Sequence, residues 1–254
     1  MLRTKGEAIL LRSKPSGEND LMVTLLHGTR GKVLLLARHA LKSRKRFLGS
    51  LELFNHLEVE FTERAGVFFG ILESSAVIDA FPLFRKDSVA FGQAAYACEL
   101  VETATRAGEP CRDILDWLLD FLVTLNRIGP GTTWSRVAEL KLLDHIGLAP
   151  GLDRCSVCGG ELASRARQAY DVARGGVLCD VCSAGGTNHV SLGTLKTLSV
   201  IRKSDLSLCG RIRFSGKAAQ EAKNFLGDFL RYHMNLDYPL KSKIFLEKLN
   251  PRFG

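Results

Sequence analysis

Two pairs of cysteines place the strongest restriction on how this 254-residue chain can fold. Cys155 and Cys158 form one Cys-x2-Cys pair, Cys179 and Cys182 form a second, and 20 residues separate the pairs. Each pair suits a tight turn whose two sulfurs face one ion, and a Gly-Gly step stands beside each pair. Four thiolates fill a tetrahedral zinc shell and leave no position open for water. We therefore predict one structural Zn²⁺ in a small lobe at about residues 151–189.

Other interpretations of the four cysteines stay open. The four cysteines could instead bind an Fe–S cluster, act as a redox pair of dithiols, or be the remainder of a site that has lost its metal, although the spacing favours zinc. Cys98, Cys111 and Cys209 stand singly and are predicted core residues. An odd total of seven cysteines does not indicate a disulfide framework.

Residues 1–80 are predicted to be β-strands, because apolar runs alternate there with turn residues. In the run Leu51–Thr62 the apolar side chains fall on odd positions, which predicts a long strand with one buried face. So many strands in a short segment must hide their edges, and a small closed barrel of the OB-fold type does this. The predicted strands are Glu7–Arg12, Leu21–Leu26, Lys32–Ala37, Leu51–Thr62, Val67–Glu73 and Ala76–Ile78.

Residues 81–254 are predicted to form a mostly helical domain that carries the cysteine lobe, so the fold class is α+β. Helical apolar spacing marks several segments, with Thr132 or Thr133 and Ser191 as predicted N-caps and Gly147 as a stop. The predicted helices cover Asp87–Ala107, Arg112–Arg127, about 134–146, a segment after Ser191, and Gly216–Met234. The apolar runs are shorter than the roughly 20 residues that cross a bilayer. With no signal peptide evident, we expect a cytoplasmic, nucleoid-associated protein without a membrane partner.

The segment Leu21–Leu51 contains seven cations and no acidic residue, in a chain whose formal net charge is +8. Ordinary surfaces mix charges, whereas a patch of one sign attracts polyanions. Nucleic acid is therefore the predicted partner, bound without base-specific readout and with a strong salt dependence. The predicted contacts are Arg30 and Lys32 on a strand, followed by Arg38, Lys42, Arg44, Lys45 and Arg46 on the adjoining loop.

For two parts of this interpretation, an ordinary structural role is the alternative to DNA binding. Phe47 could stack on a base, but packing into the barrel is the expected use of an aromatic residue there. A second basic set lies in residues 202–254, where 11 Lys or Arg residues face 5 acids, and a solvated helix face explains such cations equally well. Its predicted DNA contacts are Arg202, Lys203, Arg211, Arg213, Lys241 and Lys243.

No sequence motif indicates covalent chemistry. A phosphate-binding glycine loop, a His-Glu-x-x-His motif and the zinc deaminase pattern are all missing, and the six histidines are scattered. We therefore expect a binding protein and not an enzyme. One alternative is a nucleic-acid-processing enzyme that gathers Glu18, Asp20, Glu58 and Glu60 in space. The other is a zinc-ribbon adaptor whose partners are proteins.

The order of these features resembles the bacterial RecO recombination-mediator family over essentially the whole chain. The resemblance is carried first by residues 17–20 (Gly-Glu-Asn-Asp), 31–33 (Gly-Lys-Val) and 37–43 (Ala-Arg-His-Ala-Leu-Lys-Ser). It continues through Tyr96, Glu99 and Leu100, residues 139–143 with Ile146 and Gly147, the cysteine quartet, and residues 240–243 (Leu-Lys-Ser-Lys).

The resemblance implies an N-terminal OB-fold and a helical domain with a zinc lobe. It also implies binding to single- and double-stranded DNA and annealing of complementary strands. The implied partners are RecR and the acidic C-terminal tail of single-strand DNA-binding protein (SSB), with RecA loaded indirectly onto SSB-coated DNA. Members of the family do not all keep the four cysteines, so zinc is predicted from the spacing in this chain.

Overall fold

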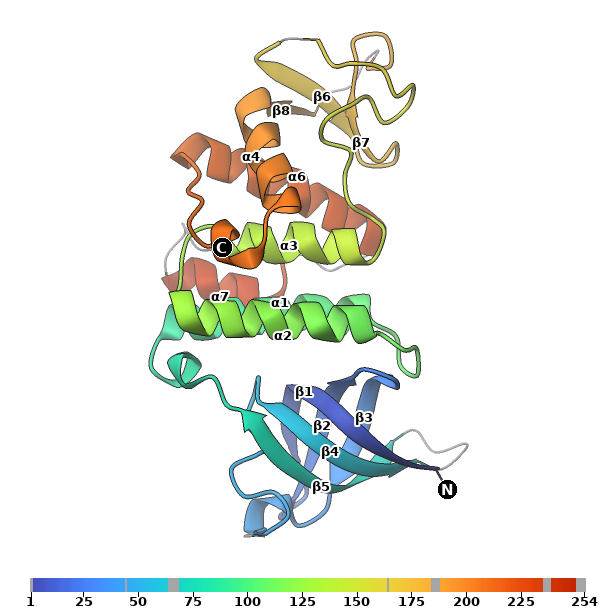
Figure 1. Cartoon of the computed structure of the whole chain (residues 1–254), viewed down its shortest axis with the longest axis vertical. Coiled ribbons are helices and arrows are strands. Elements are labelled where there is room, and N and C mark those ends of the chain that lie inside the picture. Colours follow the sequence, from blue (N-terminus) through green and yellow to red (C-terminus); the bar gives the residue numbers. More distant parts are fainter. Residues whose placement is uncertain are drawn as a thin grey trace. The chain divides into compact units, whose positions relative to one another are not determined.

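The computed structural model describes residues 2–43, 45–63, 69–163, 165–183, 188–234 and 239–249 (Figure 1). The chain divides into two compact units, Met1–Arg127 and Ile128–Gly254. The first unit contains a strand-rich barrel together with helices α1 and α2. The second unit contains the remaining helices and the cysteine lobe. The described chain is therefore of the α+β class, as the sequence predicted.

The barrel is formed by β1 (Leu2–Ser16), β2 (Asp20–His27), β3 (Gly31–Ala37), β4 (His56–Glu63) and β5 (Gly70–Asp79). Its strand order is β1-β2-β3-β5-β4, and β1 pairs with β4 to close the sheet. Only the β3–β5 pair is parallel, and the others are antiparallel. This is the topology of an OB-fold, which confirms the predicted barrel. The long strand β1 closes the barrel because its first half, Leu2–Ile9, pairs with β4 and its second half, Ala8–Ser16, pairs with β2.

The strand β4 is shorter than the sequence pattern predicts. Residues 51–54 form a turn, and β4 begins only at His56. Phe54 explains the difference because it has a positive φ of 72° and packs edge-on against Phe84 and Phe91. The alternation holds from His56 onward, where Leu57, Val59 and Phe61 are buried in the barrel. The separate strands predicted at 67–73 and 76–78 merge into β5, and residues 67 and 68 lie outside the described chain.

Helices α1 (Ser88–Ala104) and α2 (Arg112–Ile128) belong to the same compact unit as the barrel. Asp87 caps α1 by accepting hydrogen bonds from the backbone N–H groups of Val89 and Ala90. The turn between β2 and β3 requires glycine at position 31, where φ is +63°. A Cβ there would lie 2.0 Å from the carbonyl oxygen of Glu109, in the segment between the helices. Close backbone packing therefore joins the barrel to the α1–α2 connection.

The second unit is built around α3 (Trp134–His145), α4 (Leu192–Lys203) and α6 (Gly216–Met234), which pack on one another. Their core includes the fully buried side chains of Trp134, Phe225 and Phe229. Strands β6 (Arg167–Asp171), β7 (Gly176–Leu178) and β8 (His189–Ser191) form a small sheet in the order β7-β6-β8. The short helix α5 (Leu206–Cys209) and the helix α7 (Lys241–Leu249) complete the described part of this unit.

The helix ends of this unit follow the predicted signals with one exception. Ser191 caps α4 through its side chain, and Gly147 adopts a φ of +74° just after α3. Thr133 occupies the N-cap position of α3, but its hydroxyl does not cap the helix. That hydroxyl instead donates a hydrogen bond to the carbonyl of Ile212, at 2.6 Å. The predicted cap residue therefore joins α3 to the segment after α5.

Candidate metal centre and nucleic-acid interface

The four predicted cysteines meet at one point of the second unit. The sulfur atoms of Cys155, Cys158, Cys179 and Cys182 all lie within 4.8 Å of one another. The first pair lies in the turn after Gly151, and the second pair follows β7. A backbone hydrogen bond closes each turn. Gly159 N–H donates to Cys155, and Ser183 N–H donates to Cys179. Converging sulfurs on two such turns are compatible with a tetrahedral metal site. Within the described residues, this is the one cluster of three or more potential metal ligands.

The surroundings of the quartet favour ionisation of one of its sulfurs. Burial raises the pKa of Cys155, but hydrogen bonds from the backbone of Cys158, Cys179 and Val157 outweigh that effect and lower the pKa to about 6. Hydrogen bonding to Cys179 raises the pKa of Cys182 to about 12. Thiolates are the form that ligates metal, and a cation between the sulfurs offsets their mutual repulsion. The donor set therefore fits a divalent ion.

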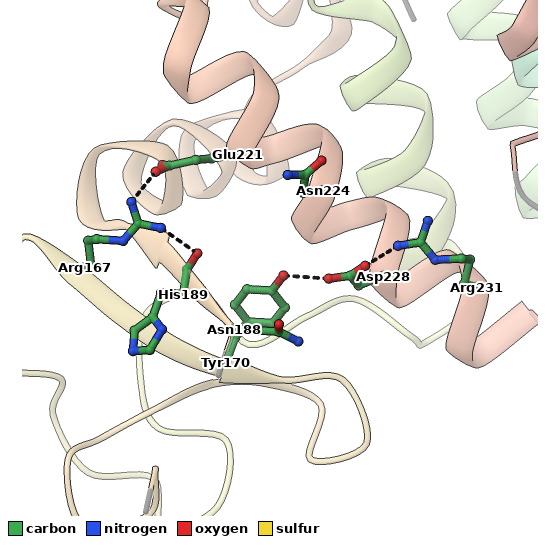
Figure 2. Close-up of a pocket in the computed structure, with 8 residues that line it drawn as sticks. All are labelled: Arg167, Tyr170, Asn188, His189, Glu221, Asn224, Asp228 and Arg231. Atoms are coloured by element: carbon green, nitrogen blue, oxygen red, sulfur yellow. Dashed lines mark hydrogen bonds and ion pairs between the residues drawn. The ribbon is translucent and has the colours of Figure 1, made fainter. Parts of the chain in front are cut away.

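Ion pairs and hydrogen bonds join the small sheet of this lobe to helix α6. A polar cavity of about 680 Å³ lies there. Figure 2 shows its two arginines, of which Arg167 pairs with an acid across the gap and Arg231 with an acid on its own helix. Arg167 on β6 contacts Glu221 on α6, with 3.0 Å between Nη1 and Oε1. Tyr170 donates its hydroxyl to Asp228 at 2.6 Å, and Arg231 contacts the same carboxylate. The contacts of Arg167 and Tyr170 hold the small sheet against α6. Because both arginines are already paired, the cavity presents little free charge.

The two cations on the barrel strand region are engaged within the first unit. Arg30 forms an ion pair with Glu63 on β4, with 2.8 Å between Nη2 and Oε2. Lys32 on β3 donates from Nζ to the backbone carbonyl of Glu102 on α1, at 2.6 Å. The acidic partner of Arg30 lies outside the acid-free segment, so the sequence pattern gave no sign of it. These two residues are therefore the weaker candidates for phosphate contact.

The remaining predicted cations of the first basic segment lie on the connector between β3 and β4, which we define as residues 38–55. Arg38, Lys42 and Lys45 are exposed, and among the described residues none of the three forms an ion pair. Arg46 is exposed as well, although it donates to the carbonyl of Arg38 and lies over the ring of Phe47, 4.9 Å from its centroid. The predicted contact Arg44 lies outside the described residues.

Phe47 packs inward, as expected for an aromatic residue at this position. Its side chain is only 4% exposed and belongs to the barrel core, together with Ala40 of the 3₁₀ turn η1 (Ala40–Lys42). Backbone hydrogen bonds hold the connector on the barrel. Leu41 N–H donates to Asn19, and Ser75 N–H donates to Arg46. The exposed cations therefore stand on a backbone that is anchored to the barrel on both sides.

Part of the second basic set is ion-paired inside its own unit. Arg202 pairs with Asp144 at 2.8 Å, and Lys203 pairs with Asp153 at 3.0 Å. Arg213 is exposed but donates to the carbonyls of Gly210 and Ile212. The predicted contacts Arg211 and Lys241 are exposed, and no ion pair is found for them within the described residues. This set therefore offers fewer free charges than its sequence suggests.

The burial of Lys243 argues against its predicted role as a DNA contact. Its side chain is fully buried, and Nζ lies 2.9 Å from Oε1 of Glu139 on α3, which Arg136 also contacts. Burial lowers the pKa of Lys243 to about 7, and the nearby Glu139 only partly opposes that effect. A side chain enclosed in this way cannot reach a phosphate, so Lys243 is a structural residue and not a DNA contact.

The acids named for the alternative enzyme do not assemble into a site among the described residues. Glu58 pairs with Lys5 and Glu60 pairs with Arg3, both across the β1–β4 ladder. Asp20 accepts a hydrogen bond from the backbone N–H of His39, 19 positions along the chain, at 2.8 Å. These carboxylates therefore stabilise the barrel surface.

Together, the fold and the cysteine site define a class of protein: an OB-fold barrel followed by helices that carry a four-cysteine lobe. Family models described as "Recombination protein O N terminal" and "Recombination protein O C terminal" match residues 1–81 and 85–244. The chain belongs to the RecO family of DNA repair proteins. No helix among the described residues is long and apolar enough to cross a membrane.

Curated relatives match this chain over 94% or more of their own length. The chain is 34% identical over 256 residues to DNA repair protein RecO of Anaeromyxobacter dehalogenans, with 100% of both chains covered. It is 32% identical over 249 residues to the DNA repair protein RecO of Syntrophus aciditrophicus, covering 96% of this chain and 95% of the relative. The protein of the same name from Pelotomaculum thermopropionicum is 32% identical over 252 residues. These relatives support a role in DNA repair and recombination.

Proposed function

We propose that this protein binds single- and double-stranded DNA through the exposed cations of its barrel connector and anneals complementary strands. The observation that carries the proposal is the state of Arg38, Lys42 and Lys45, which are exposed and lack ion pairs within the described chain. Arg46 and the undescribed Arg44 extend the same basic segment. Cations placed on two strands neutralise their phosphates and lower the repulsion that opposes pairing. This activity needs no covalent chemistry.

In the cell, the proposed role is that of a recombination mediator. Membership of the RecO family supports work with RecR to load RecA onto DNA that is coated by SSB, whose acidic C-terminal tail is the proposed contact. Of the second basic set, Arg211 and Lys241 are the members we retain as proposed DNA contacts, since their charges are exposed. Arg202, Lys203 and Arg213 are secondary candidates because each is already engaged.

We also propose that Cys155, Cys158, Cys179 and Cys182 hold one structural Zn²⁺. The mutual distances of their sulfurs support this assignment. The ion would supply no catalysis, since four protein ligands leave it no open position. Its contribution would be to the folding of a lobe whose strands, β6 to β8, are short. We further propose that residues 1–80 are the DNA-binding domain and residues 81–254 the helical domain, with the metal lobe inserted at about 151–189.

The test of DNA binding is fluorescence anisotropy with a labelled oligonucleotide across a series of salt concentrations, with and without SSB. The variant Arg38→Ala/Lys42→Ala/Lys45→Ala should bind much more weakly, with a salt slope reduced by about two to three. The control Arg202→Ala/Lys203→Ala/Arg213→Ala removes the same amount of charge elsewhere and should have a smaller effect. An unchanged isotherm for the connector variant would remove the basis of the proposal. Cleavage of the labelled strand in magnesium would favour the enzyme alternative.

A further inference from the structure

The connector carries two exposed leucines among its cations. Leu48 is 72% exposed and Leu41 is 55% exposed, whereas the residues beside them in sequence, Phe47 and Ala40, are buried in the barrel core. The chain thus turns one apolar side chain inward and the next one outward at two places in the same connector. A single exposed leucine needs no explanation, but this short segment carries two exposed leucines together with exposed cations, so its surface is both apolar and basic.

Charge indicates what this surface binds. Arg38, Lys42, Lys45 and Arg46 surround the leucines in sequence, and no acidic residue occurs between Leu21 and Leu51. Such a surface attracts a polyanion that also offers apolar faces. Unpaired nucleotides meet both conditions, because their phosphates are charged and their base faces are available. In a duplex the faces are hidden by stacking, except where a side chain inserts between base steps.

The backbone under the leucines is held firmly enough to present them. Arg46 donates from Nη2 to the carbonyl of Arg38 at 2.8 Å, which ties the two ends of the basic segment together. The hydrogen bond from Leu41 N–H to Asn19 and that from Ser75 N–H to Arg46 join the segment to the first turn and to β5. A side chain on an anchored segment loses little additional backbone entropy when it binds.

We propose that Leu41 and Leu48 contact the faces of unpaired bases in single-stranded DNA while the neighbouring cations hold its phosphates. The inference rests on the proposed DNA binding and adds to it a preference for unpaired strands. The leucines compete with base–base stacking, so a bound strand is held with its bases separated. A strand held in this way is ready to pair with a complementary strand, which is what annealing requires.

The test uses the full chain and the variant Leu41→Ser/Leu48→Ser. Anisotropy with oligo-dT should show affinity reduced by about tenfold. This is the loss expected when an apolar side chain that is buried on binding is replaced by a polar one. The slope of log K against log salt should stay unchanged, because no phosphate contact is lost. Affinity for a blunt duplex should change less than twofold. The control Leu208→Ser replaces a similarly exposed leucine (49%) in the second unit and should leave all three quantities unchanged.

A second readout reports the bases directly. An oligonucleotide containing 2-aminopurine becomes more fluorescent when that base loses its stacking neighbours. Saturating wild-type protein should increase the fluorescence, and the leucine variant at saturation should increase it less. Equal losses of affinity on single and double strands, or an unchanged 2-aminopurine signal, would overturn the inference. So would normal DNA binding combined with loss of self-association, which would make the leucines a protein contact. Failure of the wild-type protein to bind DNA would instead overturn the proposed function.

Discussion

The guanidinium of Arg30 lies 2.8 Å from the carboxylate of Glu63, so a cation from the acid-free segment is neutralised by an acid on a neighbouring part of the barrel. The pair is partly exposed, with 34% of the arginine side chain and 28% of the glutamate side chain accessible. An ion pair of this kind contributes at most about 1 kcal/mol to stability. Its larger consequence is for the electrostatic potential of the barrel, where it removes one charge from the surface that DNA would meet.

Replacing Glu63 should therefore strengthen DNA binding. In Glu63→Gln, Arg30 becomes available to a phosphate, and the salt slope for single-stranded DNA should steepen by about 0.7, the value for one additional contact. The matched control is Glu247→Gln, which removes the same charge from an ion pair with Lys223 in the second unit. Anisotropy titrations at several salt concentrations measure both variants. Equal slopes for the two variants would show that Arg30 does not reach DNA.

The buried cluster around Lys243 predicts two substitutions with unequal effects. Glu139→Gln leaves the buried Arg136 without a counter-charge and removes the acid that raises the pKa of Lys243. The second unit should therefore lose about 3 kcal/mol of stability. Lys243→Met leaves Glu139 paired with Arg136 and should cost about 1 kcal/mol or less. Urea denaturation followed by circular dichroism compares the variants. The reasoning would be contradicted if Lys243→Met were the more destabilising substitution.

Removal of the metal should affect the second unit alone. We expect about one zinc ion per chain by elemental analysis, and its loss in Cys158→Ser/Cys182→Ser. Without the ion the four sulfurs no longer hold the two turns together, so the lobe should become sensitive to protease within residues 151–189. The control Cys98→Ser/Cys209→Ser changes two cysteines outside the quartet and should keep the metal. Full protease resistance of the metal-depleted protein would argue against a structural ion.

The buried histidine of the barrel predicts a dependence of stability on pH. Burial lowers the pKa of His27, the positive charges of Arg30 and Arg112 add to this effect, and Glu63 opposes it. A lowered pKa in the folded state means that the unfolded chain binds the proton more readily. Stability of the first unit is therefore highest above the unfolded value of about 6.5 and falls as the pH decreases below it.

Thermal melts of the first unit between pH 7.5 and 5 measure this effect. In the wild type, Nδ1 of His27 accepts hydrogen bonds from the backbone N–H groups of Thr29 and Arg30. The variant His27→Asn keeps a hydrogen-bond acceptor near these two groups but cannot be protonated. Its melting temperature should decrease less between these pH values than that of the wild type. If both proteins show the same decrease, another group is responsible.

The contacts between the barrel and helices α1 and α2 predict that the barrel is not fully stable alone. Arg12 pairs with Glu102 on α1, and Cys111 N–H donates to the carbonyl of Gly28. Phe54 packs against Phe84 and Phe91, which lie beyond residue 81. A fragment of residues 1–127 should therefore melt at a higher temperature than a fragment of residues 1–81. Equal melting temperatures would place the stable boundary at the end of the barrel.

Local patterns were sufficient to predict the type of most elements. Apolar alternation from Leu57 to Phe61, the cap at Ser191 and the stop at Gly147 each act over a few residues, so a sequence window contains their whole cause. The start of β4 was predicted too early because Phe54 is needed in contacts with Phe84 and Phe91, 30 or more positions away in the chain. A window of strand-like residues contains no information about such a partner.

By itself the sequence determined the closed barrel, the helical second half and the convergence of four cysteines, because periodicity, capping and ligand spacing are local properties. Only the tertiary structure decided which cations remain free. Arg30 and Glu63 are separated by 33 positions, and Lys243 and Glu139 by 104, so their pairing depends on how strands and helices come together. Coulomb interactions depend on distance in space and on burial, and neither can be read from the order of residues. The fold places acids beside Arg30 and Lys243. Arg38, Lys42 and Lys45 have no ion pair within the described residues, and they are therefore the proposed DNA contacts.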